Sequence, residues 1–177
     1  MITVIPNFLP KELSSNLVEL HKKATHYARS IPSNPSSFQE SLFITEHPYW
    51  NAIEPILMHP IRMYLDDHSP VPSTVRDALM LQAPLIYKGD LNGTPLHFDS
   101  ICSGKFVRYL ICSVYLNKVQ GGELSFPQQE VTVPCDVGTL VLFPSHIICP
   151  HKVSPCVGNR YMLRADLVDY AWQVSSR

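Results

Sequence analysis

The sequence lacks a strong excess of charge of either sign. Its 14 Lys and Arg residues stand against 15 Asp and Glu residues, which gives a formal net charge of -1 at pH 7. It also lacks an apolar run near the roughly 20 residues that span a bilayer, and no charged and then apolar signal sequence opens it. Nucleic acids and anionic lipids attract basic surfaces, so we expect neither nucleic acid nor membrane as a partner. A soluble, cytoplasmic protein is the expectation that follows.

Cysteine is present, but without a pattern that would organise the fold. None of the five cysteines belongs to a C-x-x-C pair; they are Cys102, Cys112, Cys135, Cys149 and Cys156. An odd set of this kind disfavours both a disulfide framework and structural zinc, so we expect mostly buried thiols. Cys149 differs from the others because it lies two residues before His151 and would share its strand face.

The length and composition suit one folded domain. The 177 residues are 45% hydrophobic, which is enough for a sizeable core despite 16 prolines. The segment 10–30 places Leu13, Leu17 and Leu20 at helical spacing and predicts an amphipathic helix of about 15 residues. The Ser, Pro and Asn content of residues 30–41 predicts a loop after this helix.

A second helical region is expected over residues 49–68. Its prolines predict that the helix is interrupted, because proline removes a backbone donor and clashes with the preceding turn. The residues expected to face inward are Trp50, Ile53, Ile56 and Leu57.

From about residue 79 the sequence changes to short apolar runs separated by turn signals such as KGDLNG and CVGN. Strands are expected over 79–87, 106–116, 123–126, 130–134, 138–143, 148–153 and 159–169. Many short strands after two helices indicate a small barrel or jelly-roll sandwich with the helices packed outside. We therefore expect one α+β domain over 1–177, with a helical part about 1–75 and a strand-rich core about 79–170.

His97 and Asp99 lie two residues apart in the stretch TPLHFDSICSG. Alternate residues of an extended chain point to the same face, so the two side chains either aim at one metal ion or form an ordinary surface pair. An iron(II) site for oxygen chemistry needs two imidazoles and one carboxylate on one face, with the opposite positions open. The third ligand would be a histidine on a distant strand, and the candidates are His146 and His151.

His151 is the better candidate for the third ligand. It lies in the strand-like segment CPHKVSP, and Arg160 follows nine residues later. An arginine on the adjacent strand would offer a bidentate guanidinium to a carboxylate in the pocket. His146 lies in a segment that looks like a turn and has no such companion.

These motifs stand in an order that resembles one enzyme family. The blocks are HFD (97–99), VYLNKVQGGELSFP (114–127), GTLVLFPSH (138–146) and HKVSPCVGNRY (151–161). Their order and spacing over about residues 80–170 resemble the prolyl 4-hydroxylase branch of the 2-oxoglutarate/iron(II) oxygenases. The resemblance implies a double-stranded β-helix, or jelly-roll, core. It also implies an enzyme that uses Fe(II), 2-oxoglutarate and O2, with ascorbate as a candidate reductant.

The resemblance implies roles for individual residues as well. His97, Asp99 and His151 would ligate the iron, and this set favours hydroxylation over halogenation, because halogenating relatives replace the carboxylate. The other implied roles belong to Arg160 on the distal carboxylate of 2-oxoglutarate, Tyr115 and Tyr87 in the same pocket, Leu124 as its apolar wall, and Arg108 as a candidate substrate contact.

The implied reaction is hydroxylation of an unactivated C–H bond, with decarboxylation of 2-oxoglutarate to succinate. The leading substrate is a prolyl residue of a protein or peptide. A free amino acid or other small metabolite is the alternative substrate, and a non-catalytic jelly-roll binding module is the alternative class. The sequence leaves the oligomeric state open.

One stretch departs from the family pattern. In RYMLRADLVDY, Arg164 and Asp166 stand where these hydroxylases carry an apolar or small residue and then tryptophan. If the two side chains face the cavity, they make it more polar and weaken the case for proline as substrate. The alternative is that they pair with each other on the rim.

Overall fold

The computed structural model of the protein describes residues 2–25, 28–30, 39–68, 79–82, 84–89, 91–99 and 107–169, so Cys102 lies outside the described residues. The helices in these ranges are α1 (Lys11–Lys23) and α2 (Pro48–His68), and a short 3-10 turn, η1, covers Pro127–Gln129. The strands are β1 (Thr3–Ile5), β2 (Ala28–Ser30), β3 (Gln39–Phe43), β4 (Met80–Leu81), β5 (Leu85–Gly89), β6 (Thr94–His97), β7 (Val107–Tyr115), β8 (Gln120–Gly121), β9 (Leu124–Phe126), β10 (Val131–Val133), β11 (Leu140–Pro144), β12 (His151–Val153), β13 (Cys156–Val157), β14 (Arg160–Arg164) and β15 (Leu167–Asp169).

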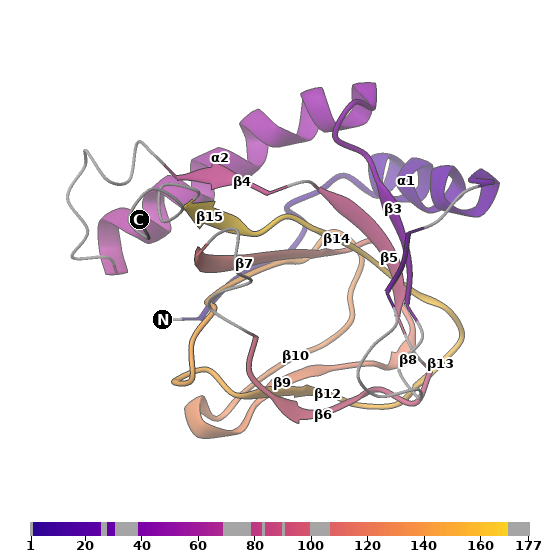
Figure 1. Ribbon diagram of the computed structural model, residues 1–177. Coiled ribbons are helices and arrows are strands. Elements are labelled where there is room, and N and C mark those ends of the chain that lie inside the picture. The colour runs from indigo at the N-terminus through magenta and orange to yellow at the C-terminus, as the bar shows by residue number, and fades with distance from the viewer. Residues whose placement is uncertain are drawn as a thin grey trace, which may run out of the picture.

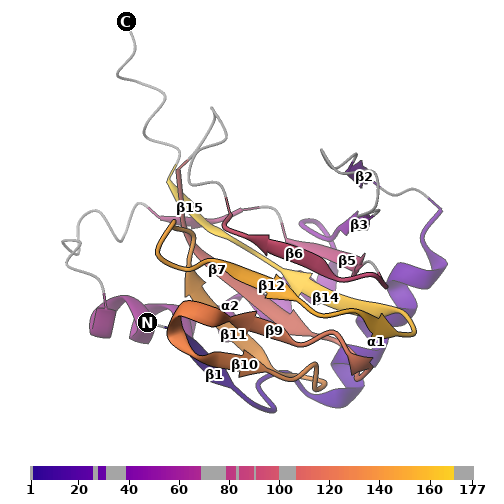
Figure 2. The same cartoon turned by 90° about the horizontal axis from the view of Figure 1, so that it is seen from below.

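Two antiparallel sheets face each other, and both helices lie outside them against the larger one (Figure 1). The major sheet has the order β1-β11-β7-β14-β5-β3-β2, and β15 joins it by pairing with β7 and β4. The minor sheet has the order β10-β9-β12-β6, and Figure 2 shows it laid across the major sheet. This arrangement confirms the predicted α+β jelly roll with its helices packed outside.

The major sheet is buried on both faces, and alternate residues along its strands pack into two different cores. On β7, Leu110, Cys112 and Val114 pack toward the helices, whereas Ile111 and Tyr115 belong to the core between the two sheets. Successive side chains of a strand point to opposite faces, so a continuous apolar run serves two cores at once. The inner core is the one that surrounds the functional cavity described below.

Helix α1 confirms the first prediction. It is 13 residues long, Leu17 is fully buried, and Leu13 and Leu20 are partly buried against the same core. Helix α2 corrects the second prediction, because it runs without a break for 21 residues through Pro55 and Pro60. Packing of its buried face against the major sheet outweighs the hydrogen bonds that the prolines remove.

The inward-facing residues of α2 were predicted correctly with one exception. Trp50, Ile53 and Leu57 are buried, but Ile56 is 46% exposed. The buried stripe continues through Ile61, and Ile56 falls just outside its edge at about 100° per residue. Within the described residues, neither helix is long and apolar enough to cross a bilayer.

Several strand boundaries also differ from those expected. The stretch 79–87 contains two strands, β4 and β5, and the expected strand over 148–153 begins only at His151. Residues 39–41, expected within a loop, belong to β3, which lies between β5 and the edge strand β2 of the major sheet. The polar residues that open this short strand give little apolar alternation, so composition alone misreads it.

Candidate active site

A cavity lies between the two sheets, where inward-facing residues of both converge. The minor sheet contributes His97 from β6 and His151 from β12, and the major sheet contributes Tyr115, Arg160 and Arg164. These residues are far apart in sequence. In the jelly roll their strands either lie next to each other in one sheet or face each other across the inner core.

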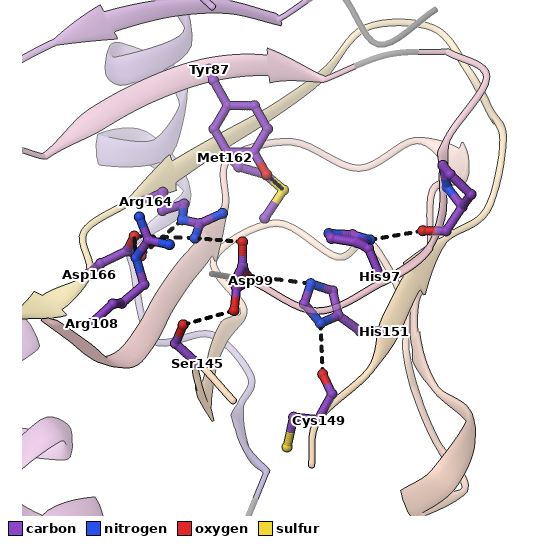
Figure 3. A network of polar contacts seen from close by, with 11 residues as sticks. Tyr87, His97, Asp99, Arg108, Ser145, Cys149, His151, Met162, Arg164 and Asp166 are labelled. Carbon is purple, nitrogen blue, oxygen red and sulfur yellow. Dashed lines mark hydrogen bonds and ion pairs between the residues drawn. The ribbon is translucent and has the colours of Figure 1, made fainter. Parts of the chain in front are cut away.

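The two histidines lie side by side on paired strands. His97 and His151 are register partners of β6 and β12, and their ring centroids are 4.4 Å apart. Each Nδ1 hydrogen-bonds to a main-chain carbonyl, that of Pro95 for His97 at 2.8 Å and that of Cys149 for His151 at 3.0 Å. A carbonyl can only accept, so each Nδ1 is the donor and each Nε2 keeps its lone pair for the cavity, as metal-ligating imidazoles require (Figure 3).

Asp99 completes the predicted trio. Its Oδ2 lies 3.6 Å from Nε2 of His151, and its Oδ1 lies 3.2 Å from a terminal nitrogen of Arg164. Burial tends to raise the pKa of Asp99, but Arg164, His151 and Arg108 together hold it below its ordinary value. The carboxylate is therefore anionic at neutral pH. Burial lowers the pKa of His151 and outweighs the backbone hydrogen bond and Asp99, which favours the neutral, ligating imidazole.

The opposite wall of the cavity holds two donors without acceptors. Arg160 is 2% exposed, and one of its terminal nitrogens donates a long hydrogen bond of 3.4 Å to the carbonyl of Gly122. Its Nε and the hydroxyl of Tyr115 are buried and have no hydrogen-bond partner in the part of the chain that the structure describes. Burial raises the pKa of Tyr115 against the opposing charge of Arg160, so the hydroxyl remains a donor. Unpaired buried donors are costly, and an anionic ligand would satisfy both.

Two further predicted pocket residues also line this cavity. Leu124 of β9 is buried there as an apolar wall, as the resemblance implies. Tyr87 of β5 is buried, and its hydroxyl donates to the sulfur of Met162 at 3.1 Å (Figure 3). Met162 was not predicted, although it alternates with Arg160 and Arg164 on β14 and the strand period could have found it.

The remaining candidates lie apart from this constellation or at its border. His146 is exposed in the turn after β11, as the sequence indicated. Cys149 lies in the same turn rather than on β12, and its sulfur points away from the imidazoles (Figure 3). Arg108 contacts Asp166, with 2.7 Å between Nε and Oδ2.

Arg164 and Asp166, which depart from the family pattern, pair with each other, and Arg164 also faces the cavity. Arg164 forms a two-point contact with Asp166, from Nε to Oδ1 at 2.9 Å and from a terminal nitrogen to Oδ2 at 3.2 Å. Arg164 also lines the cavity and reaches Asp99. The pair is therefore formed, and the cavity is more polar at this end.

His97, Asp99 and His151 have the donor atoms that a metal ion requires, but the distance between two of these donors is longer than a bound ion would give. The buried Oδ2 of Asp99 accepts no hydrogen bond from any described residue and faces His151, which leaves a carboxylate oxygen available to an ion. Two donors, each about 2.1 Å from one octahedral ion, would lie about 3 Å apart, so the 3.6 Å pair would need to tighten. No three His, Cys, Asp or Glu donors within the described ranges are already gathered as an ion would hold them.

Comparison with known proteins gives a match over the part of the chain that carries the cavity. Residues 84–165, which contain all of these cavity residues, match the family model of the 2OG-Fe(II) oxygenase superfamily. No curated protein matches the sequence.

Solved structures of prolyl hydroxylases share the fold. The viral collagen prolyl hydroxylase of Paramecium Bursaria Chlorella virus-1, in complex with 2-oxoglutarate, is 17% identical and superposes with a TM-score of 0.68 over 95% of this chain and 96% of that one. A prolyl hydroxylase from Trichoplax adhaerens, bound to a peptide fragment of hypoxia inducible factor, is 18% identical with a TM-score of 0.68 over 99% and 87% of the two chains. A prolyl-4-hydroxylase from Pseudomonas putida is 18% identical with a TM-score of 0.64 over 95% and 92%.

Fold, cavity and family match together define a class. The family match over residues 84–165 and the shared fold support a 2-oxoglutarate- and Fe(II)-dependent dioxygenase that consumes O2, in agreement with the class and co-substrates implied by the motifs. More particularly, it is similar to the prolyl 4-hydroxylases in fold.

Proposed function

We propose that the protein hydroxylates a prolyl residue of a protein or peptide, with Fe(II) held by His97, Asp99 and His151 and 2-oxoglutarate held by Arg160 and Tyr115. The observation that carries the proposal is the pair of buried, unpartnered donors, Arg160 Nε and Tyr115 Oη, in the same cavity as two imidazoles and a carboxylate. Bound iron would supply the oxidation, with loss of CO2 from 2-oxoglutarate and insertion of one oxygen atom into a C–H bond.

The residues of the chain orient the reactants and keep the cavity dry. Arg160 and Tyr115 would hold the distal carboxylate of 2-oxoglutarate through charge-assisted hydrogen bonds that are strong in a buried setting. Leu124 would exclude water from the carbon chain of the co-substrate, and Tyr87 is held by Met162 beside it. Carbonyl contacts at Nδ1 keep both imidazoles oriented, so the ligand nitrogens do not need to be ordered during binding.

The prolyl substrate is supported by the proteins of similar fold. Two of them are named for collagen prolyl or prolyl-4-hydroxylation, and a third is complexed with a peptide fragment. Arg108 would contact the substrate beside Asp99, and its link to Asp166 would orient it there. Arg108→Ala should then lower the amount of hydroxylated peptide formed per succinate more than it lowers succinate formation itself.

A free amino acid or other small metabolite is the second candidate substrate. The observation that favours it is the polar end of the cavity, where Arg164 and Asp99 meet. A charged group there suits a free carboxylate better than the apolar ring of a prolyl residue within a chain. A non-catalytic binding module is disfavoured by the family match and by the unpartnered donors.

The test uses the purified chain, Fe(II) and 2-oxoglutarate. Under anaerobic conditions the mixture should give the weak visible charge-transfer band of a 2-oxoglutarate–iron chelate. In air, proline-containing peptides should stimulate succinate formation and gain about 16 Da, the mass of one inserted oxygen atom. If peptides are inert while free proline or another amino acid is hydroxylated, the metabolite candidate replaces the peptide candidate. Absence of the band with the wild-type protein would contradict the site assignment.

A further inference from the structure

The three proposed metal ligands are not held in the same way. His97 and His151 are paired across the ladder of the minor sheet and have their rings fixed by carbonyls. Asp99 lies beyond the end of β6, which stops at His97. Its main-chain carbonyl accepts a long hydrogen bond from Ser145 Oγ at 3.4 Å, which constrains the backbone but not the carboxylate.

The carboxylate is held instead by a residue of the opposite sheet. One terminal nitrogen of Arg164 lies 3.2 Å from Oδ1 of Asp99 and 3.2 Å from Oδ2 of Asp166. Nε of Arg164 lies 2.9 Å from Oδ1 of Asp166. The guanidinium therefore uses two donors on Asp166 and shares one of them with Asp99, as Figure 3 shows.

Arg164 is itself immobilised. Its strand β14 is paired on both sides, with Leu85 and Ser113 as the register partners of Arg164. Asp166 is 7% exposed, its Oδ2 forms an ion pair with Arg108 Nε at 2.7 Å, and its main-chain carbonyl accepts from the amide of Gln82 at 2.7 Å. A buried carboxylate held by an ion pair and by its own main chain fixes the guanidinium that it binds.

We propose that Arg164, held by Asp166, is the positioning residue for Asp99: it binds Oδ1 and so presents Oδ2 to the metal beside His151. This inference rests on the proposed function, because it assumes that Asp99 is a ligand. It assigns a role to the departure from the family pattern at Arg164 and Asp166. It also predicts ligation through one oxygen only, because Oδ1 is engaged by the arginine.

Two physical effects of Arg164 oppose each other at this site. A cation next to a ligand repels a metal ion, whereas a hydrogen bond to the distal oxygen of a carboxylate orients it. Asp166 contributes a negative charge within 3 Å of the guanidinium, and although it also pairs with Arg108, it offsets part of the repulsion and leaves the orienting contact. The positioning effect should therefore dominate.

The geometry of the arginine matters as much as its charge. A planar guanidinium can contact Asp99 and Asp166 at the same time through donors in a rigid fork. A lysine ammonium at this position would retain the charge, but it would have to choose or share between the two carboxylates without that fork. Lysine therefore should not restore the position of Asp99.

The test measures metal affinity rather than turnover. Mn(II) binding to the full chain is titrated by electron paramagnetic resonance in the absence of 2-oxoglutarate and O2. Arg164→Met should bind Mn(II) about 10- to 100-fold more weakly than wild type, the cost typical of removing an outer-shell partner of a metal ligand. Arg164→Lys should show a loss of the same order. Thermal unfolding establishes that each variant is folded, and Lys preserves the partly buried charge where Met does not.

Matched variants separate the possible failures. Arg62→Met, at an exposed position of α2, should leave Mn(II) affinity unchanged. The inference is overturned if Arg164→Met binds Mn(II) as tightly as wild type or more tightly, or if Arg164→Lys has wild-type affinity. If His97→Ala also leaves Mn(II) affinity unchanged, the proposed ligand set itself is wrong, which is a different outcome.

Discussion

Gly89 and Arg160 are register partners across β5 and β14, and the guanidinium of Arg160 lies against the open Cα of the glycine. A Cβ added at Gly89 would stand 3.0 Å from a terminal nitrogen of Arg160 and 3.1 Å from its Nε. Gly122 closes the other side, where a Cβ would stand 3.0 Å from Cδ of the same arginine. Because Gly89 and Gly122 have no side chain, they leave the space that Arg160, the residue proposed to bind 2-oxoglutarate, occupies.

Gly89→Ala is therefore expected to displace the guanidinium without touching the metal ligands. The apparent KM for 2-oxoglutarate should rise severalfold, while Mn(II) affinity stays at the wild-type value. Gly158→Ala is the control, because nothing lies within 4 Å of its added Cβ although its φ of +90° makes the substitution strained. That variant should lose about 1 kcal/mol of stability and leave the KM unchanged. Equal KM values for Gly89→Ala and wild type would argue against the placement of the co-substrate at Arg160.

Loss of a ligand is predicted to abolish turnover. His97→Ala, Asp99→Ala and His151→Ala should each eliminate succinate formation and weaken Mn(II) binding, because each removes one donor of the proposed set. His146→Ala should retain most activity, since this side chain is exposed in a turn. Loss of activity in His146→Ala together with activity retained in His151→Ala would show that His146, and not His151, is the third ligand.

Arg160 and Tyr115 should separate co-substrate binding from metal binding. Arg160→Ala removes a buried, charged partner, and the apparent requirement for 2-oxoglutarate should rise at least about tenfold. Tyr115→Phe removes one hydrogen bond and should cost about 1–2 kcal/mol of co-substrate affinity. Isothermal titration with 2-oxoglutarate, in the presence of Mn(II), measures both. An Arg160→Ala protein that lost Mn(II) but kept 2-oxoglutarate affinity would contradict the assignment.

His21 is predicted to make stability depend on pH. It is 1% exposed, its Nε2 lies 3.0 Å from the carbonyl of Glu40, and burial lowers its pKa below the ordinary value of 6.5. A depressed folded pKa means that the unfolded chain binds the proton first, so stability is complete above pH 6.5 and is lost as the pH falls below it.

Thermal unfolding at pH 8 and pH 5.5 checks this prediction. His21→Gln has no titrating group at this position, so the difference in Tm between the two pH values should be smaller in the variant than in wild type. The comparison is made between the two proteins because Asp99 and His151 have shifted pKa values of their own and are common to both. The same pH dependence in both proteins would contradict a buried, neutral His21.

Local sequence was sufficient to predict the class and most of the proposed site. His97 and Asp99 share a strand-like segment, Arg160 follows His151 at a fixed offset, and the motifs keep one order along the chain. Chemistry of this kind is recognisable because it depends on residue types at short spacing, and strand alternation converts that spacing into a shared face. The jelly roll could be predicted for the same reason, from many short strands at regular intervals.

Contacts between residues that are distant in sequence could be determined only from the tertiary structure. Pro55 and Pro60 do not break α2 because the major sheet supports its buried face, and residues 39–41 are in a strand because β5 offers them an edge. Arg164 contacts Asp99 from the opposite sheet, 65 positions away in the numbering. Hydrophobic periodicity is a local property and does not predict such contacts. They depend on how burial of the shared core brings the two sheets together.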